Sequence, residues 1–197
     1  MAVRKTIDKS YGTYFLTITC YKWTRLFEIT NGYDLVYKWF DYLKGKGNYI
    51  NGYVIMPNHF HAMLSFQNSS HSINKIIGNG KRFLAYQIVD RLKQLNRFDI
   101  LTLLGAGVNQ NDRKRGKLHE VFESSFDWKE CWSDNFIDQK LDYMHQNPKA
   151  GKWDLVEDLI SYPYSSAKFY LTDIQGDYIV TSISELKDID LTNTGDQ

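Results

Sequence analysis

Three short, mostly hydrophobic segments in the first third of the chain are predicted to be strands, and hydrophobic and polar residues alternate along the first of them. These segments are residues 14–20, 49–56 and 59–66, and they are rich in β-branched and aromatic residues. Only Pro57 and Asn58 separate the second segment from the third, so we expect these two to pair as an antiparallel hairpin. A fourth strand is predicted over residues 120–126.

Apolar residues recur at helical spacing in three further segments. They predict helices over residues 33–43, from an N-cap at Ser72 to about residue 98, and over residues 135–146. Gly78 and Gly80 are costly inside a helix, so a break is expected in the first third of the long one. Residues 105–116 have no apolar period and are predicted to form a mobile basic loop.

Strands and helices are thus expected in the order β-α-β-β-α-β-α. This order predicts an α+β fold, a ferredoxin-like antiparallel sheet with helices packed on it. A chain of 197 residues can bury a substantial core in one domain. Its two cysteines are too few for a disulfide framework, and no apolar run approaches the roughly 18 residues of a membrane span. We therefore expect a cytoplasmic protein without a membrane partner.

The overall charge of +1 conceals an uneven distribution of charged residues. Residues 81–117 carry nine Lys and Arg against three Asp, whereas residues 171–197 carry six acidic residues against one Lys. A basic middle and an acidic tail indicate a patch that binds a polyanion, although a solvated helix face gives the same pattern. The candidate phosphate-binding residues are Lys81, Arg82, Arg91, Lys93, Arg113, Lys114, Arg115 and Lys117.

The strongest local motif is His59-Phe60-His61 at the start of a predicted strand. Side chains two residues apart in a strand lie on the same face, while Phe60 points to the other face. Two neutral imidazoles side by side supply two ligands for a divalent metal. The alternative is a pair of solvent-facing histidines, which such a short motif does not exclude.

A second motif lies on the last predicted helix, where Tyr143 and Asn147 are four residues apart and share a face. A carboxamide oxygen can complete the ligands of a hard cation, and a phenol one turn away can reach a substrate held there. His145 lies about 200° round the helix from Tyr143 and is not expected on this face. Taken alone, the spacing is equally consistent with packing.

Together the two motifs resemble the signature of the IS200-like transposases, and most closely that of the REP-associated tyrosine transposases. Residues 52–61 and 142–148 carry the resemblance, and residues 161–167 are similar to the aromatic Ser-Ser segment that follows the tyrosine helix in that family. These enzymes belong to the His-hydrophobic-His (HUH) single-strand endonucleases. The similarity covers roughly residues 12–170, which we take as the transposase domain, followed by an acidic tail over residues 171–197. Residues 97–117 depart from a compact member of the family and are interpreted as a basic loop insertion.

The resemblance implies a metal-dependent enzyme that nicks and rejoins single-stranded DNA through a 5′-phosphotyrosine intermediate. It makes Tyr143 the nucleophile, His59 and His61 metal ligands, and Asn147 the third ligand, with the adjacent Gln146 as the alternative. Mixed imidazole and amide ligands suit Mg²⁺ or Mn²⁺. The implied partner is single-stranded DNA that forms hairpins, bound by a monomer or a homodimer. Two other functions remain open, a non-catalytic DNA-binding protein and a metal-dependent phosphodiesterase.

Overall fold

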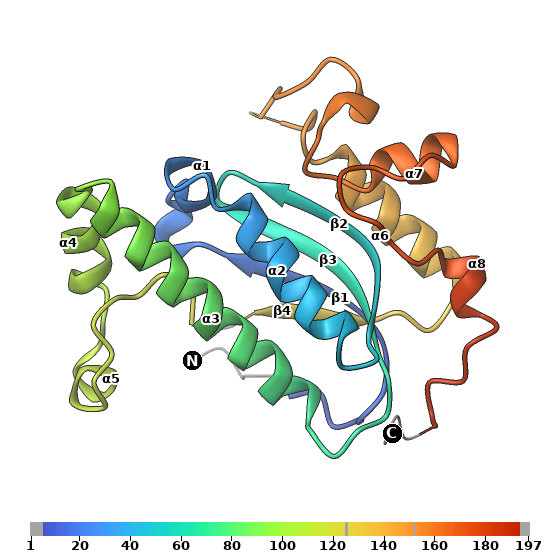
Figure 1. The fold of residues 1–197 in the computed structure, drawn as a ribbon, viewed down its shortest axis with the longest axis horizontal. Coiled ribbons are helices and arrows are strands. Elements are labelled where there is room, and N and C mark those ends of the chain that lie inside the picture. The colour runs from blue at the N-terminus through green and yellow to red at the C-terminus, as the bar shows by residue number, and fades with distance from the viewer. Residues whose placement is uncertain (1–5, 125, 152, 194–197) are drawn as a thin grey trace.

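Four strands form one antiparallel sheet in the computed structural model, which describes residues 6–124, 126–151 and 153–193 (Figure 1). The strands are β1 (Gly12–Thr19), β2 (Tyr49–Met56), β3 (His59–Phe66) and β4 (Asp127–Glu130), in the order β2-β3-β1-β4. Both ends of the chain, residues 1–5 and 194–197 with Asp196, lie outside the described residues, as do residues 125 and 152. The predicted α+β fold with a ferredoxin-like antiparallel sheet is confirmed.

The helices cover both faces of this sheet. In chain order the helical elements are η1 (Tyr21–Trp23), α1 (Leu26–Ile29), α2 (Tyr33–Lys44), α3 (Ile73–Gln94), α4 (Phe98–Ala106), α5 (Gln110–Lys114), α6 (Asp134–Gln146), η2 (Leu159–Ser161), α7 (Ala167–Thr172) and α8 (Ile183–Leu186). Helices α2 and α3 run in front of the sheet in Figure 1. The larger hydrophobic core lies between them and the sheet, and a smaller core joins the other face to α6.

Helix α3 runs without a break from Ile73 to Gln94, with the Ser72 side chain accepting a hydrogen bond from Lys75 N as the predicted N-cap. The predicted break at Gly78 and Gly80 is therefore wrong. Gly80 is instead a packing position, because a Cβ there would overlap the indole of Trp39 on α2. Gly80 lowers the intrinsic helix propensity of α3, but because it has no side chain it allows α2 and α3 to pack closely.

Residues 98–114 are mostly helical, so the prediction of a basic loop over residues 97–117 is wrong for this stretch. Helix α4 contacts α3 and packs Ile100, Leu101 and Leu104 against the larger core. Helix α5 begins at an Asn109 side chain that accepts a hydrogen bond from Asp112 N. The apolar face of α4 spans only two turns and α5 has none, so neither helix shows a long apolar period.

The fourth strand lies later in the chain than residues 120–126. Among the described residues of that range, the strand pairing is one isolated bridge from Phe122 to Cys20, the residue that follows the end of β1 at Thr19. The paired segment is Asp127–Glu130, which aligns with residues 14–17 of β1. It is a polar edge strand with alternate residues exposed, so its sequence carries no run of apolar residues to predict it.

Close packing against β2 fixes the position of helix α6. A Cβ at Gly52 would lie 2.8 Å from both Leu141 Cδ2 and Met144 Cε, so only glycine leaves room for the helix at its present distance. The segment that follows η2 then runs along the outer edge of β2: Ile55 N donates to Tyr164 O at 2.8 Å and Ser166 N to Tyr53 O at 3.0 Å. Helix α6 is thereby held against the hairpin.

The acidic tail is partly packed against the domain. Val180 and Tyr178 are buried, and Tyr178 donates a hydrogen bond to Asp41 on α2 at 2.8 Å. Thr181 N donates to Ile50 O on β2 at 2.9 Å. Within the described ranges, none of the helices has the length and apolar character needed to cross a lipid bilayer.

Candidate metal and tyrosine site

Strand β3 places both histidines of the motif on the face of the sheet that α6 covers. Phe60 points to the opposite face and is fully buried in the larger core, whereas Met63 lies with His59 and His61 on the α6 side. The two imidazole rings have centroids 4.9 Å apart and an interplanar angle of 79°. Both residues are 4% exposed, so the alternative of two solvent-facing histidines is wrong.

The Nδ1 atom of each histidine is bound to a neighbouring side chain. Nδ1 of His59 lies 2.7 Å from Oδ1 of Asn58, whose Nδ2 donates to the Trp23 carbonyl at 3.0 Å. That second bond fixes the orientation of the amide, so Nδ1 of His59 is the donor and its Nε2 carries the free lone pair. Nδ1 of His61 lies 2.8 Å from the Thr17 hydroxyl, which orients the ring and can either donate or accept.

Burial keeps both imidazoles neutral. It lowers the pKa of His59 to about 4. Burial and the neighbouring His59 lower the pKa of His61 to about 3. Nε2 of His61 is buried without a hydrogen-bond partner of regular geometry among the described residues. A buried ring nitrogen without a partner costs free energy. When Nδ1 of His61 donates to the Thr17 hydroxyl, Nε2 carries a free lone pair, which suits coordination of a metal cation.

Helix α6 brings Tyr143 and Asn147 to the two histidines. The ring of Tyr143 lies 5.4 Å from that of His61, and the residue is 53% exposed. Nδ2 of Asn147 donates to the Tyr143 carbonyl at 2.9 Å, so its carboxamide oxygen is the atom that can interact with the histidines. The Asn147 side chain is near enough to both rings to favour their protonated forms, against the effect of burial.

The alternative third ligand, Gln146, is exposed. Asn147, and not Gln146, is among the side chains that shift the pKa values of the two histidines. Within the described residues, no group of three His, Cys, Asp or Glu side chains is arranged to hold a metal. A described side chain of another type that lies beside both rings is that of Asn147. His145, on the other side of α6, is buried and lies 2.9 Å from the Ser166 hydroxyl.

Lys140 completes the surroundings of Tyr143 and is not evident from the sequence motifs. Its Nζ lies 5.5 Å from the centroid of the Tyr143 ring and 5.4 Å from that of Phe15 on β1. The Phe15 ring in turn stacks on His61 at 5.3 Å. The spacing of three residues between Lys140 and Tyr143 on a predicted helix is the signal that could have identified this cation.

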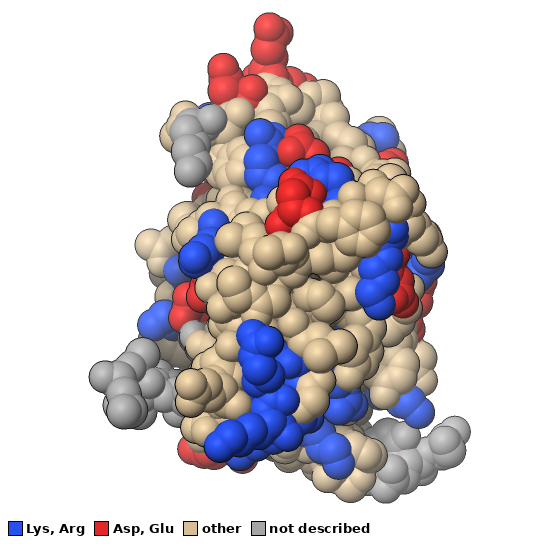
Figure 2. Space-filling model, turned by 90° about the vertical axis from the view of Figure 1, so that its left-hand side faces the viewer, with Lys and Arg blue, Asp and Glu red and all other residues tan. Residues whose placement is uncertain are grey.

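Most of the candidate phosphate-binding residues contact other protein groups, and they differ in how exposed they are. Arg82 donates to Asn79, and Lys93 pairs with Asp90 at 3.8 Å. Arg113 donates to the Gly105 carbonyl at 2.7 Å. Lys81 donates to the Glu123 carbonyl at 2.7 Å, and Lys117 forms a 2.6 Å ion pair with Glu120. Figure 2, which faces the end of the molecule where α4 and α5 lie, shows Lys and Arg gathered low on this face, at the level of α5. The exposed members of the predicted set are Arg82, Lys93, Arg113, Lys114 and Arg115.

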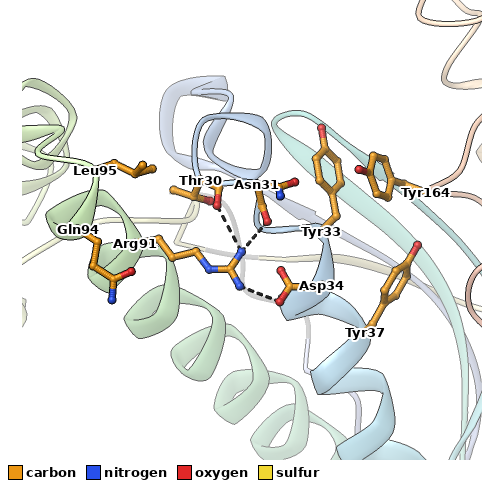
Figure 3. A pocket seen from close by; sticks show the side chains of 9 residues that line it. All are labelled: Thr30, Asn31, Tyr33, Asp34, Tyr37, Arg91, Gln94, Leu95 and Tyr164. Carbon is orange, nitrogen blue, oxygen red and sulfur yellow. Dashed lines mark hydrogen bonds and ion pairs between the residues drawn. The ribbon is translucent and has the colours of Figure 1, made fainter.

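Arg91 belongs to a separate cavity of about 550 Å³ between the start of α2 and the end of α3 (Figure 3). Its guanidinium forms a 2.7 Å ion pair with Asp34 and donates to the carbonyls of Thr30 and Asn31. The Arg91 guanidinium, which the sequence suggested as a phosphate-binding group, is therefore already paired within the protein. None of the residues of the histidine and tyrosine site lines this cavity.

Comparison with known proteins places the fold beside that of a transposase. No protein-family model matches the sequence, and no curated protein is detectably similar to it. A REP-associated tyrosine transposase, solved bound to a REP hairpin, superposes with a TM-score of 0.62 at 13% identity, over 92% of this chain and 100% of that one. A candidate transposase from Deinococcus radiodurans R1 superposes with a TM-score of 0.42 at 16% identity, over 73% of this chain and 97% of that one. The resemblance suggested by the motifs thus extends to the fold.

Proposed function

We propose that this protein is a metal-dependent tyrosine transposase that nicks and rejoins single-stranded DNA through a 5′-phosphotyrosine intermediate. One observation carries the proposal. A buried, neutral His61 whose Nε2 has no regular hydrogen-bond partner within the described residues lies beside the half-exposed phenol of Tyr143. A cation site and a nucleophile brought together from a strand and a distant helix form the minimum machinery for cutting a phosphodiester.

His59 and His61, through their Nε2 atoms, and Asn147, through its carboxamide oxygen, would hold the metal. Two imidazoles and an amide suit Mg²⁺ or Mn²⁺, and Mn²⁺ matches the imidazoles better. When bound, the metal supplies positive charge for the non-bridging phosphate oxygens and fixes the phosphate for in-line attack. Asn58 and Thr17 would keep the two rings oriented, since each contacts the Nδ1 atom of a ligand.

Tyr143 would act as the nucleophile. Its hydroxyl oxygen forms a bond to the phosphorus, the bond from phosphorus to the 3′ oxygen breaks, the phenol proton leaves to solvent and the departing 3′ oxygen takes up a proton. The products are a 5′-phosphotyrosine and a free 3′-OH, and attack by a 3′-OH reverses the step. Because the tyrosine ester conserves the energy of the phosphodiester, rejoining needs no nucleotide cofactor.

Lys140 would supply a second positive charge beside the phenol. A phenol is mostly protonated at neutral pH, so its attack on phosphate builds up negative charge that a nearby cation stabilises. Lys140 Nζ lies 5.5 Å from the Tyr143 ring, one helical turn before it. The same ammonium group can contact the phosphate, since it carries three hydrogen-bond donors on a flexible stem.

DNA hairpins are the proposed partner. The structurally similar REP-associated transposase was solved with a REP hairpin, and this supports the same class of substrate here. The exposed residues of the basic set, Arg113, Lys114 and Arg115 among them, would contact phosphates without reading sequence. The alternative is a protein that binds hairpins or single strands and has lost the chemistry.

Replacing Tyr143 with Phe tests the proposal. Tyr143→Phe removes only the attacking oxygen, so cleavage of hairpin-flanked single-stranded DNA with Mn²⁺ should fall at least about a thousandfold while binding is kept. Tyr86→Phe is the matched control, since Tyr86 is 65% exposed on α3. Cleavage by Tyr143→Phe at the rate of the unsubstituted protein would remove Tyr143 from the mechanism. Hairpin binding without cleavage by any of the three proteins would identify the non-catalytic alternative.

A further inference from the structure

Two consecutive residues before α1 adopt a left-handed backbone conformation that is unfavourable for residues with a side chain. Lys22 has φ 50° and Trp23 has φ 57°. Neither is Gly, Asn or Asp, the residues that most readily adopt this conformation. Strain of this kind persists only where surrounding contacts impose it, and it gathers at functional sites.

Contacts from three parts of the chain impose this conformation. Trp23 N donates to the Cys20 carbonyl at 2.9 Å, and Lys22 N donates to a carboxylate oxygen of Glu123 at 2.8 Å. Asn58 Nδ2 donates to the Trp23 carbonyl at 3.0 Å. Asn58 also accepts from Nδ1 of His59, so one buried amide fixes both the histidine and the strained turn.

The turn presents a large aromatic side chain at the edge of the candidate metal site. The rings of Trp23 and His59 have centroids 5.6 Å apart at an interplanar angle of 72°. Trp23 is nevertheless 58% exposed, so packing on His59 accounts for less than half of its surface. Trp153, the other indole near His59, lies under the guanidinium of Arg25 and is only half-buried.

We propose that Trp23 is a stacking platform for an unpaired nucleobase next to the phosphate that Tyr143 attacks. The inference rests on the proposed function, since it takes single-stranded DNA as the occupant of the site. A strand held by one phosphate needs its neighbouring bases oriented, and the face of an indole binds any base by stacking. Trp23 is then a positioning residue on the His59 side of the site, and Tyr143 lies beside His61.

A purely structural role for Trp23 makes different predictions. If the indole only covers His59, its removal should weaken Mn²⁺ binding and lower the melting temperature. If the indole holds a base, its removal should weaken DNA binding and leave Mn²⁺ affinity as it was. Trp132 is a matched control, because it is 81% exposed and lies away from His59. The preceding residue, Cys131, donates its N–H to the Thr13 carbonyl at the start of β1, whereas His59 pairs with Thr19 at the end of β1.

The test uses the full chain carrying Tyr143→Phe, and hairpin-flanked single-stranded DNA whose cleavage position has been mapped with the unsubstituted protein. 2-Aminopurine, a fluorescent base quenched by stacking, replaces each base flanking that position in turn. Trp23→Ala should weaken DNA binding about tenfold and restore the fluorescence at one position, since stacking on an aromatic residue contributes about that much per base. Trp23→Phe should keep most of the DNA affinity and most of the fluorescence quenching, and Trp132→Ala should change neither quantity.

Two further variants keep the result interpretable. Trp23→Gly should bind DNA as weakly as Trp23→Ala but melt at a higher temperature, because glycine accepts a positive φ without strain. DNA binding by Trp23→Ala equal to that of the parent, or a loss matched by lost Mn²⁺ affinity, would overturn the inference while DNA cleavage by Tyr143 still stands. Failure of the unsubstituted protein to cleave any such DNA would overturn the proposed function and this inference with it.

Discussion

On the face of the sheet under α2 and α3, the inward positions of β3 are Phe60, Ala62, Leu64 and Phe66, all fully buried in the larger core. On the face under α6, the alternate positions of the same strand are His59, His61, Met63 and Ser65, and three of these four are polar and buried. One strand of eight residues therefore contributes apolar side chains to a core on one side and mostly polar, buried side chains on the other.

The difference between the faces separates stability from chemistry. Burying polar groups costs free energy that apolar side chains of similar volume would not cost. Ser65 recovers this cost through hydrogen bonds with Thr13 and Asn51, whereas Nε2 of His61 has no regular partner within the described residues. Substitutions under α2 and α3 should therefore change the free energy of unfolding, and those at the histidine end of the α6 face should change activity.

The largest effect is expected from removing a proposed metal ligand. His61→Ala should lower Mn²⁺ affinity and DNA cleavage at least about a hundredfold, because even residues that only orient a ligand contribute tenfold to a hundredfold. Titration calorimetry with Mn²⁺ measures the first effect and a cleavage assay the second. His71→Ala, at an exposed histidine before α3, serves as the control. Mn²⁺ affinity in His61→Ala equal to that of the parent would place the metal elsewhere.

Two glycines on opposite faces compare the two regions directly. Gly80→Ala and Gly52→Ala each force a methyl group into packed side chains, so both should cost about 1–3 kcal/mol in the free energy of unfolding. Gly52→Ala should also cut the cleavage rate by about tenfold or more, because it displaces the helix that carries Tyr143. Denaturant melts and cleavage assays on both proteins check this. Equal cleavage by the two variants would show that the position of α6 does not limit the reaction.

A smaller effect is expected at Lys140. Lys140→Met removes the charge and keeps the length of the side chain, so the rate of cleavage should fall about tenfold at saturating Mn²⁺. Mn²⁺ affinity should not fall, because the lost charge repels a cation at His61. Lys140→Arg should recover much of the rate. Single-turnover kinetics separate this effect from binding. An unchanged rate in Lys140→Met would leave the cation with only its packing against Phe15 and Phe136.

The smallest effect is expected on the surface near α5. Lys114→Gln and Arg115→Gln should each weaken hairpin binding a few-fold and reduce the slope of log affinity against log salt by about one. Lys46→Gln, at an exposed lysine after α2, should leave the slope unchanged. A slope unaffected by the first two substitutions would mean that the basic end of the molecule in Figure 2 lies away from the DNA.

Much of the fold was predictable from the sequence because the larger core imposes a strong pattern. The bounds of the hairpin, residues 49–56 and 59–66, agree with β2 and β3 to the residue. The errors lie where the pattern is weak. Strand β4 is a polar edge of four residues. The apolar face of α4 spans only two turns, and α5 has an N-cap but no buried residue.

The candidate site was predictable only where its residues form motifs. His59, His61, Tyr143 and Asn147 follow from two short patterns whose meeting in space depends on the glycine contact between β2 and α6. Thr17 contacts His61 only because β1 pairs with β3 in a register that sets these residues opposite each other. Trp23 depends on a left-handed turn that no residue preference predicts.

One measurement tests the central claim most directly, namely that a cation site and Tyr143 act together on DNA. The protein is incubated with hairpin-flanked single-stranded DNA and Mn²⁺, digested with protease, and searched by mass spectrometry for a peptide that carries a nucleotide. A phosphodiester link to Tyr143 is expected, formed with Mn²⁺ and absent when the metal is chelated. Strand cleavage with the link on another residue, or with no link to the protein, would exclude Tyr143 as the nucleophile.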